Sequence, residues 1–75
     1  MKFLRISCYQ LNGVMKENSR KVNINPAMIV SIEHVFGATK IVTLGGDYYT
    51  HLAEHFLLEL VENTLRENMF DLKLN

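Results

Sequence analysis

Two histidines and a glutamate in the C-terminal half of the chain have the spacing of a zinc-peptidase motif. His51, Glu54 and His55 form the pattern H-x-x-E-H, in which two histidines one helical turn apart bind zinc and the glutamate activates a water molecule. Such an enzyme also needs a distant third ligand and a substrate cleft, for which a chain of 75 residues offers little room. The sequence therefore predicts no catalytic residue and no enzyme.

The same segment leaves a weaker metal hypothesis open. His51, His55, Glu59 and Glu62 are spaced four, four and three residues apart; on a helix they would share one face, where they could chelate a metal between subunits. A solvated polar face is the simpler interpretation, so no metal and no cofactor is predicted. His34 follows the phase of a predicted strand and is expected to be a partly buried histidine. A small-ligand or metal site around His34, His51 and His55 is the third functional alternative.

Two other features that could carry chemistry have structural explanations. Cys8 is the only cysteine, which excludes an intramolecular disulfide and favours a reducing compartment. It shares the phase of Leu4 and Ile6 and is predicted to be a small buried hydrophobic residue. The pair Gly45-Gly46 lacks the Lys-Ser/Thr that follows in a phosphate-binding loop, so it is predicted to be a hairpin turn.

The length and composition describe one small globular unit. With 75 residues, of which 48% are hydrophobic, the chain has room for a single domain over residues 1–75. A domain of this size buries roughly 60% of its unfolded surface, so a homo-oligomer is expected as a source of further stability. No apolar run approaches the roughly 20 residues of a membrane span. The sequence therefore predicts a cytoplasmic protein.

The charges are unevenly distributed. Residues 1–40 carry six basic and two acidic residues, and residues 41–75 carry two basic and six acidic residues. A basic sheet packed on an acidic helix explains this pattern, and complementary charge between subunits or with a partner is the other interpretation. Nucleic acid is the less favoured partner because the net charge is zero. Its candidate contacts are Lys2, Arg5, Arg20, Lys21 and Lys40.

Alternating apolar residues predict four or five antiparallel strands. Their approximate ranges are 3–11, 21–25, 28–36, 39–44 and 47–50. The first strand would bury Leu4, Ile6 and Cys8. The third strand would bury the face that carries Met28, Val30, Ile32 and His34. We expect these strands to form a strongly bent or barrel-like sheet.

The apolar period changes to nearly four at about residue 51 and predicts one amphipathic helix over about 51–70. Thr50 is the favoured N-cap because its hydroxyl can accept from a first-turn N–H. The apolar stripe comprises Ala53, Phe56, Leu57, Leu60, Val61, Leu65, Met69 and Leu72. A subunit contact is predicted at residues off this stripe or in the tail, namely Leu58, Phe70, Leu72 and Leu74. The predicted fold class is α+β, with this helix packed on the sheet.

Motifs around the predicted turns are similar to those of a known family. A Leu-Asn-Gly turn lies at 11–13, an Ile-Asn-Pro step at 24–26 precedes an Ile-x-x-Ile-Glu strand at 29–33, and a Thr-Leu-Gly-Gly hairpin lies at 43–46. Over residues 4–62 this order resembles the small FlbD/SwrD-like proteins associated with bacterial flagellar operons and swarming. The same strand and hairpin resemble LytTR DNA-binding domains less closely.

The family resemblance implies a small accessory or adaptor protein, related to motility, that acts through protein contacts. The expected partners are a second copy of the chain and an unidentified protein, and the contact would use Leu58 and Phe70 or an exposed strand edge. A nucleic-acid-binding or regulatory module is the main alternative.

Overall fold

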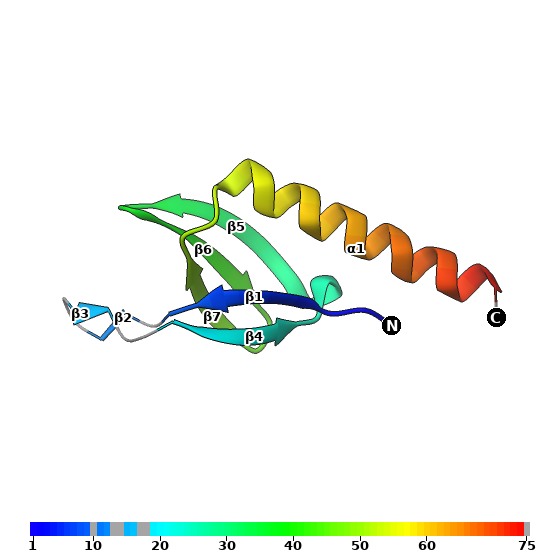
Figure 1. Ribbon diagram of the computed structural model, residues 1–75, viewed down its shortest axis with the longest axis horizontal. Coiled ribbons are helices and arrows are strands. Elements are labelled where there is room, and N and C mark those ends of the chain that lie inside the picture. The colour runs from blue at the N-terminus through cyan, green and yellow to red at the C-terminus, as the bar shows by residue number, and fades with distance from the viewer. Residues whose placement is uncertain (10, 13–14, 17–18, 75) are drawn as a thin grey trace.

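The computed structural model describes residues 1–9, 11–12, 15–16 and 19–74 of the chain, with side chains for 1–9 and 19–70. The described residues form seven strands and one long C-terminal helix, arranged as in Figure 1. The elements are β1 (Leu4–Cys8), β2 (Leu11–Asn12), β3 (Met15–Lys16), β4 (Arg20–Ile24), a 3₁₀ turn η1 (Pro26–Met28), β5 (Ile29–Val35), β6 (Ala38–Thr43), β7 (Gly46–Thr50) and α1 (Glu54–Leu74). The predicted α+β class is confirmed.

The first sheet is the antiparallel pair β1–β4, in which Leu4 lies opposite Ile24 and Cys8 opposite Arg20. Burial alternates along β1 as the sequence predicts, with Leu4, Ile6 and Cys8 all buried. This period of two places one face of the pair on the core and leaves the other face for solvent. The short strands β2 and β3 pair only with each other.

The second sheet is the antiparallel meander β5–β6–β7. Gly37 has a φ of +74° at the first turn, and Gly46 has a φ of +143° at the second. L-residues with a Cβ rarely adopt these conformations, which explains glycine at both turns. The second turn is further fixed because the Thr43 hydroxyl donates to the Gly46 carbonyl at 2.6 Å and accepts from the Gly45 amide at 3.1 Å. The hairpin predicted for Gly45-Gly46 is confirmed.

A bulge in β5 overturns the predicted alternation of that strand. Ile29 pairs with Thr43, whereas Ser31 pairs with Val42, so Val30 is an extra residue in the ladder. A bulged residue shifts the phase of the strand by one position. Val30 is therefore 63% exposed and not inside, while both Ile29 and Ile32 pack against the core. The prediction that Met28, Val30 and His34 line the buried face is wrong, since all three are exposed.

The two sheets meet at one bridge instead of forming a single closed sheet. The Tyr9 amide donates to the Tyr49 carbonyl at 2.9 Å, which links the end of β1 to β7. Two residues before Tyr9, the Ser7 carbonyl accepts from the Thr50 hydroxyl at 3.0 Å instead of from a backbone amide. The main chain then leaves β7 for the helix. Five strands in two sheets replace the single, barrel-like sheet expected from the sequence.

Helix α1 begins at Glu54, three residues after the predicted start at 51, and ends at Leu74. The start differs because the Thr50 hydroxyl bonds to β1 and to the Leu52 amide at 3.3 Å, so Thr50 does not cap the helix. The inner face of the helix completes a core of Leu4, Ile6, Cys8, Ile24, Ile41, Leu57 and Val61. Figure 1 shows the last turns extending beyond both sheets. Within the described residues, no helix has the length and apolar character needed to cross a membrane.

Candidate functional site

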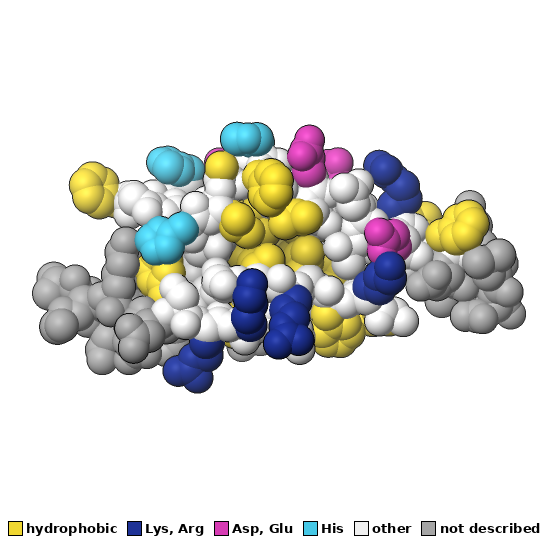
Figure 2. All heavy atoms as spheres, viewed as in Figure 1, with side chains coloured by type: hydrophobic (Ala, Val, Ile, Leu, Met, Phe, Trp, Pro, Cys, Tyr) yellow, Lys and Arg dark blue, Asp and Glu magenta, His cyan; other side chains and the backbone are white. Residues whose placement is uncertain are grey.

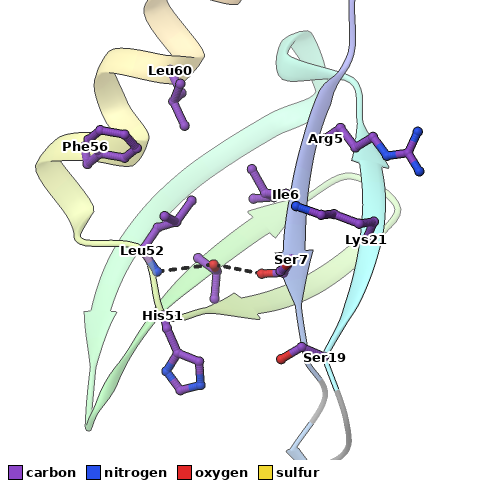
Figure 3. A pocket seen from close by; sticks show the side chains of 10 residues that line it. Arg5, Ile6, Ser7, Ser19, Lys21, His51, Leu52, Phe56 and Leu60 are labelled. Carbon is purple, nitrogen blue, oxygen red and sulfur yellow. Dashed lines mark hydrogen bonds between the residues drawn. The ribbon is translucent and has the colours of Figure 1, made fainter.

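A groove runs between the first half of α1 and the β1–β4 sheet. It is open to solvent on one side and has a volume of about 370 Å³, within the range of sites that hold ligands or peptide side chains. Figure 3 shows it from close by, with the helix on one side and β1 on the other. We call it the basic groove, and its lining residues are Arg5, Ile6, Ser7, Ser19, Lys21, Thr50, His51, Leu52, Phe56 and Leu60.

Apolar side chains from α1 and from the segment before it form one wall and the floor of the basic groove. Leu52 and Leu60 are half-buried and pack against the core, whereas Phe56 is 48% exposed. In Figure 3 Leu52 and Leu60 point into the space between the helix and β1, whereas the Phe56 ring lies against the helix. The space-filling view shows apolar side chains gathered at the centre of this face, with basic side chains along one border (Figure 2). An exposed phenylalanine beside half-buried leucines is typical of a contact surface.

The opposite wall of the basic groove is cationic. Lys21 and Arg5 extend from the outer face of the β1–β4 sheet, and both are exposed. Figure 3 shows the Lys21 side chain lying across β1 with its amino group on the groove side, while the Arg5 guanidinium extends toward β4. Neither residue makes an ion pair within the described part of the chain. None of the described residues that line the groove is acidic, so within this part of the chain its positive charge has no acidic counterpart.

Two buried threonines hold the linker that closes one end of the basic groove. Thr50 is 1% exposed, and its hydroxyl donates to the Ser7 carbonyl and accepts from the Leu52 amide. These two bonds are the dashed lines of Figure 3. Thr39, which is 3% exposed, donates from its hydroxyl to the Leu52 carbonyl at 2.7 Å. Leu52 is therefore bound through both its amide and its carbonyl, which fixes where the helix starts relative to β1.

The three histidines named from the sequence line a second cavity of about 360 Å³ on the other side of this linker. We call it the histidine cavity, and it includes His34, His51, His55 and Glu54. The His51 ring stacks on Tyr9 with a centroid distance of 4.6 Å. His34 is exposed, so the prediction of a partly buried histidine is wrong.

The histidines and carboxylates do not form a metal centre in this arrangement. His51 precedes the helix, so the H-x-x-E-H segment does not place His51 and His55 one helical turn apart. Glu59 and Glu62 are exposed on the helix without His51 on their face. Among the described residues, no group of three or more histidine, cysteine, aspartate or glutamate side chains could hold a metal ion. The alternative of a four-residue chelate on one helix face therefore lacks its first member, His51.

The basic residues named for nucleic acid do not form one open surface. Lys2 makes an ion pair with Glu67 at 2.8 Å, and Lys40 makes one with Asp47 at 3.6 Å. Arg5 and Lys21 are brought together at the basic groove. Arg20, although exposed, lies opposite Cys8 at the end of the ladder and does not line the groove.

The residues named for a subunit contact lie away from the basic groove. Leu58 is 42% exposed and Phe70 is 62% exposed. The side chains of Leu72 and Leu74 lie outside the part of the chain that the structure describes. Phe70 lines a smaller cavity of about 290 Å³ with Lys2, Arg66 and Glu67.

Cys8 has no nucleophilic role in either cavity. Burial raises the pKa of its thiol to about 11, so the thiolate that would attack a substrate is scarce at neutral pH. The predicted role as a small buried hydrophobic residue is confirmed by its 3% exposure.

Sequence reasoning missed the apolar wall of the basic groove. The sequence pattern places Phe56 in the apolar stripe of the helix, and it names Lys21 as a nucleic-acid contact and as part of the basic first half of the chain, without bringing the two residues together. The width of the apolar stripe was the available signal, because eight residues form a broader band than one sheet face covers. Searches against protein-family models, curated proteins and solved structures found no match to this chain.

Proposed function

We propose that this protein is a non-enzymatic accessory or adaptor module that binds a protein partner in the basic groove. The observation that carries the proposal is the exposed Phe56 on one side of a groove whose other side carries Lys21 and the base of the Arg5 side chain, with no acidic residue among the described lining residues. Aromatic residues and arginine are enriched at the energetic centres of protein interfaces. Cations that make no ion pair with any described residue favour a partner with acidic groups, because complementary charge speeds association and selects the partner.

A protein fits this groove better than a nucleic acid does. Nucleic-acid affinity depends on several phosphate contacts by free cations, and two of the five candidate cations are already ion-paired. An apolar wall formed by Leu52, Phe56 and Leu60 instead suits aliphatic or aromatic side chains of a polypeptide.

The resemblance of residues 4–62 to FlbD/SwrD-like proteins supports placing the partner among proteins of motility. We further propose that the protein self-associates, and that Leu58 and Phe70 on the outer side of α1 form the contact. The test is light scattering after size exclusion, in which we expect an oligomer that Phe70→Glu converts to a monomer. A clean monomer for the unaltered protein would refute the contact.

The groove proposal is tested by placing a photo-crosslinking amino acid at Phe56 in native cells. We expect a crosslinked protein partner whose yield falls when Lys21→Glu is added. The matched control places the same amino acid at Phe36, which is fully exposed at the tip of the first hairpin of the second sheet. A product that forms equally at both positions, or that persists unchanged with Lys21→Glu, would contradict the proposal.

A further inference from the structure

One edge of β1 has backbone groups directed toward the basic groove. In an antiparallel ladder, successive residues direct their N–H and C=O groups to opposite edges of the strand. The Tyr9 amide and the Ser7 carbonyl both bond on the β7 side of β1. Arg5 is two residues before Ser7. The N–H and C=O groups of Arg5 and the N–H group of Ser7 must therefore also face that side, away from β4.

No strand in the described part of the chain pairs with this edge at Arg5 and Ser7. β1 pairs along its length with β4, and its described links to β7 are the bridge at Tyr9 and the bond from the Thr50 hydroxyl to the Ser7 carbonyl. After Thr50 the chain turns away into the linker and α1. In Figure 3 this edge of β1 faces the helix across the groove, while β4 lies on the other side. The amide and carbonyl of Arg5 and the amide of Ser7 thus form a short open edge.

We propose that the basic groove binds an extended, acidic–apolar peptide segment that adds as a strand to β1 at Arg5–Ser7. This inference rests on the proposed function and names the partner's chemistry. Strand addition uses main-chain hydrogen bonds for affinity and alternate side chains for specificity. The open N–H and C=O groups of β1 would form the main-chain hydrogen bonds. The apolar and cationic walls of the groove would contact the alternate side chains.

The side-chain pattern of the peptide follows from the faces of β1. Residues of an added strand alternate between the core side and the solvent side. On the core side they would meet Ile6 of β1 and then Leu52 and Leu60, which calls for apolar side chains. On the solvent side they would lie beside Arg5 and the amino group of Lys21, which calls for aspartate or glutamate. The recognised segment therefore alternates apolar and acidic residues.

The same charges argue against a second copy pairing through this edge. If two β1 strands paired edge to edge, Arg5 and Lys21 of one copy would lie beside the same cations of the other copy. Like charges on neighbouring strands are destabilising. Charge complementarity therefore favours a foreign acidic segment over self-pairing at this edge.

The test uses full-length protein and a labelled seven-residue peptide that alternates glutamate and valine. Binding is measured by fluorescence anisotropy, and the amide signals of Arg5 and Ser7 are followed by NMR. We expect binding that is lost with a lysine–valine peptide and weakened at least about tenfold by Lys21→Glu. Arg66→Glu is the matched control, because it makes the same charge change at an exposed helix residue outside the groove, and we expect it to bind normally.

Backbone pairing is tested with two N-methylated forms of the peptide. One carries methyl groups on the valine amides and the other on the glutamate amides, and these two sets face opposite edges of a strand. We expect one form to lose at least about tenfold in affinity and the other to bind within about threefold. The Arg5 and Ser7 amides should exchange with solvent faster than the Ile6 amide in the free protein, and more slowly once the peptide is bound.

The outcomes separate this inference from the proposed function. If both methylated forms bind like the parent, or no peptide binds while the Phe56 crosslink forms, strand addition is wrong and the groove remains a protein-binding site. If the lysine–valine peptide binds as well as the glutamate–valine peptide, the acidic partner class is wrong. If the Phe56 crosslink is absent, the proposed function itself fails.

Discussion

The basic groove and the histidine cavity are neighbours of similar volume that share His51 and Leu52 in their walls. The histidine cavity is lined by all three histidines of the chain, yet the described residues hold no group of three or more side chains arranged to bind a metal ion. The basic groove contains only His51 of the H-x-x-E-H motif, but among the described residues it combines an exposed aromatic residue, cations without an ion pair and a strand edge without a paired strand.

This difference shows that residue type and residue placement are separate requirements for a site. The H-x-x-E-H segment supplies the types, but it spans the end of the linker and the start of α1, so its helical spacing is lost. Phe56 and Lys21 are ordinary residues that become a site only because Thr50 and Thr39 fix the linker opposite β1. If this is correct, loss of the linker anchor should affect both cavities, whereas only the basic groove should bind a ligand.

The largest effect is expected from Thr50→Val, which removes the hydroxyl that anchors the shared linker. The change leaves the Ser7 carbonyl and the Leu52 amide without their partner. Since an unsatisfied buried polar group costs about 1–3 kcal/mol, we expect the free energy of unfolding to fall by about 2–3 kcal/mol. Urea denaturation of the purified protein measures this change.

Thr43→Val is the matched control for the loss of a threonine hydroxyl. The Thr43 hydroxyl also makes two hydrogen bonds, but they lie in the exposed hairpin between β6 and β7. Water can replace them, so we expect a loss of about 0.5–1 kcal/mol. An equal loss for the two variants would mean that the Thr50 hydroxyl does not anchor the linker in the way described.

The alternation of β1 and β4 was predictable because each strand buries one face, and a simple period of two then describes it. The bulge at Val30 was not predictable, since it depends on how β5 pairs with β6 and not on the residues of β5 alone. The helix start was missed for a similar reason. Thr50 is a good N-cap by residue type, but its hydroxyl is used by Ser7, which is distant in sequence.

The basic groove follows from the same long-range contacts. Lys21 and Phe56 are 35 positions apart, and only the β1–β4 pairing and the anchored linker bring them to one groove. In the described part of the chain, no strand pairs with β1 at Arg5 and the Ser7 amide, because the backbone of β7 pairs with this segment only at the Tyr9 bridge. The sequence pattern predicts both strands, but it does not predict where β1 and β7 separate.

A smaller effect is expected from Phe56→Ser, which should weaken partner binding without unfolding the protein. Phe56 is 48% exposed, so its removal should cost little stability, whereas truncation of an aromatic residue at an interface costs about 1–2 kcal/mol or more of binding energy. We expect affinity for the glutamate–valine peptide to fall about tenfold. Anisotropy titrations and urea denaturation of the same samples separate binding from stability.

Met69→Ser is the corresponding control on the far half of the helix. Met69 is 61% exposed and does not line the basic groove, so its truncation should leave peptide affinity unchanged. If both variants lose affinity equally, peptide binding is a general property of exposed apolar residues on α1, and the basic groove loses its special role.

The smallest effect is expected from zinc, which should change neither the unaltered protein nor the double variant His51→Ala, His55→Ala. A metal that bound the histidine cavity at 100 times its Kd would add about 2.7 kcal/mol of stability, enough to raise the Tm by about 10 °C or more in a domain of this size. We expect a Tm shift on adding zinc of less than about 1 °C. Because the double variant also loses the stacking of His51 on Tyr9, worth about 0.5–1.5 kcal/mol, each protein is compared with itself before and after zinc is added. A large zinc-dependent rise in Tm that the double variant lacks would restore the metal hypothesis, and would place a functional site in each of the two cavities.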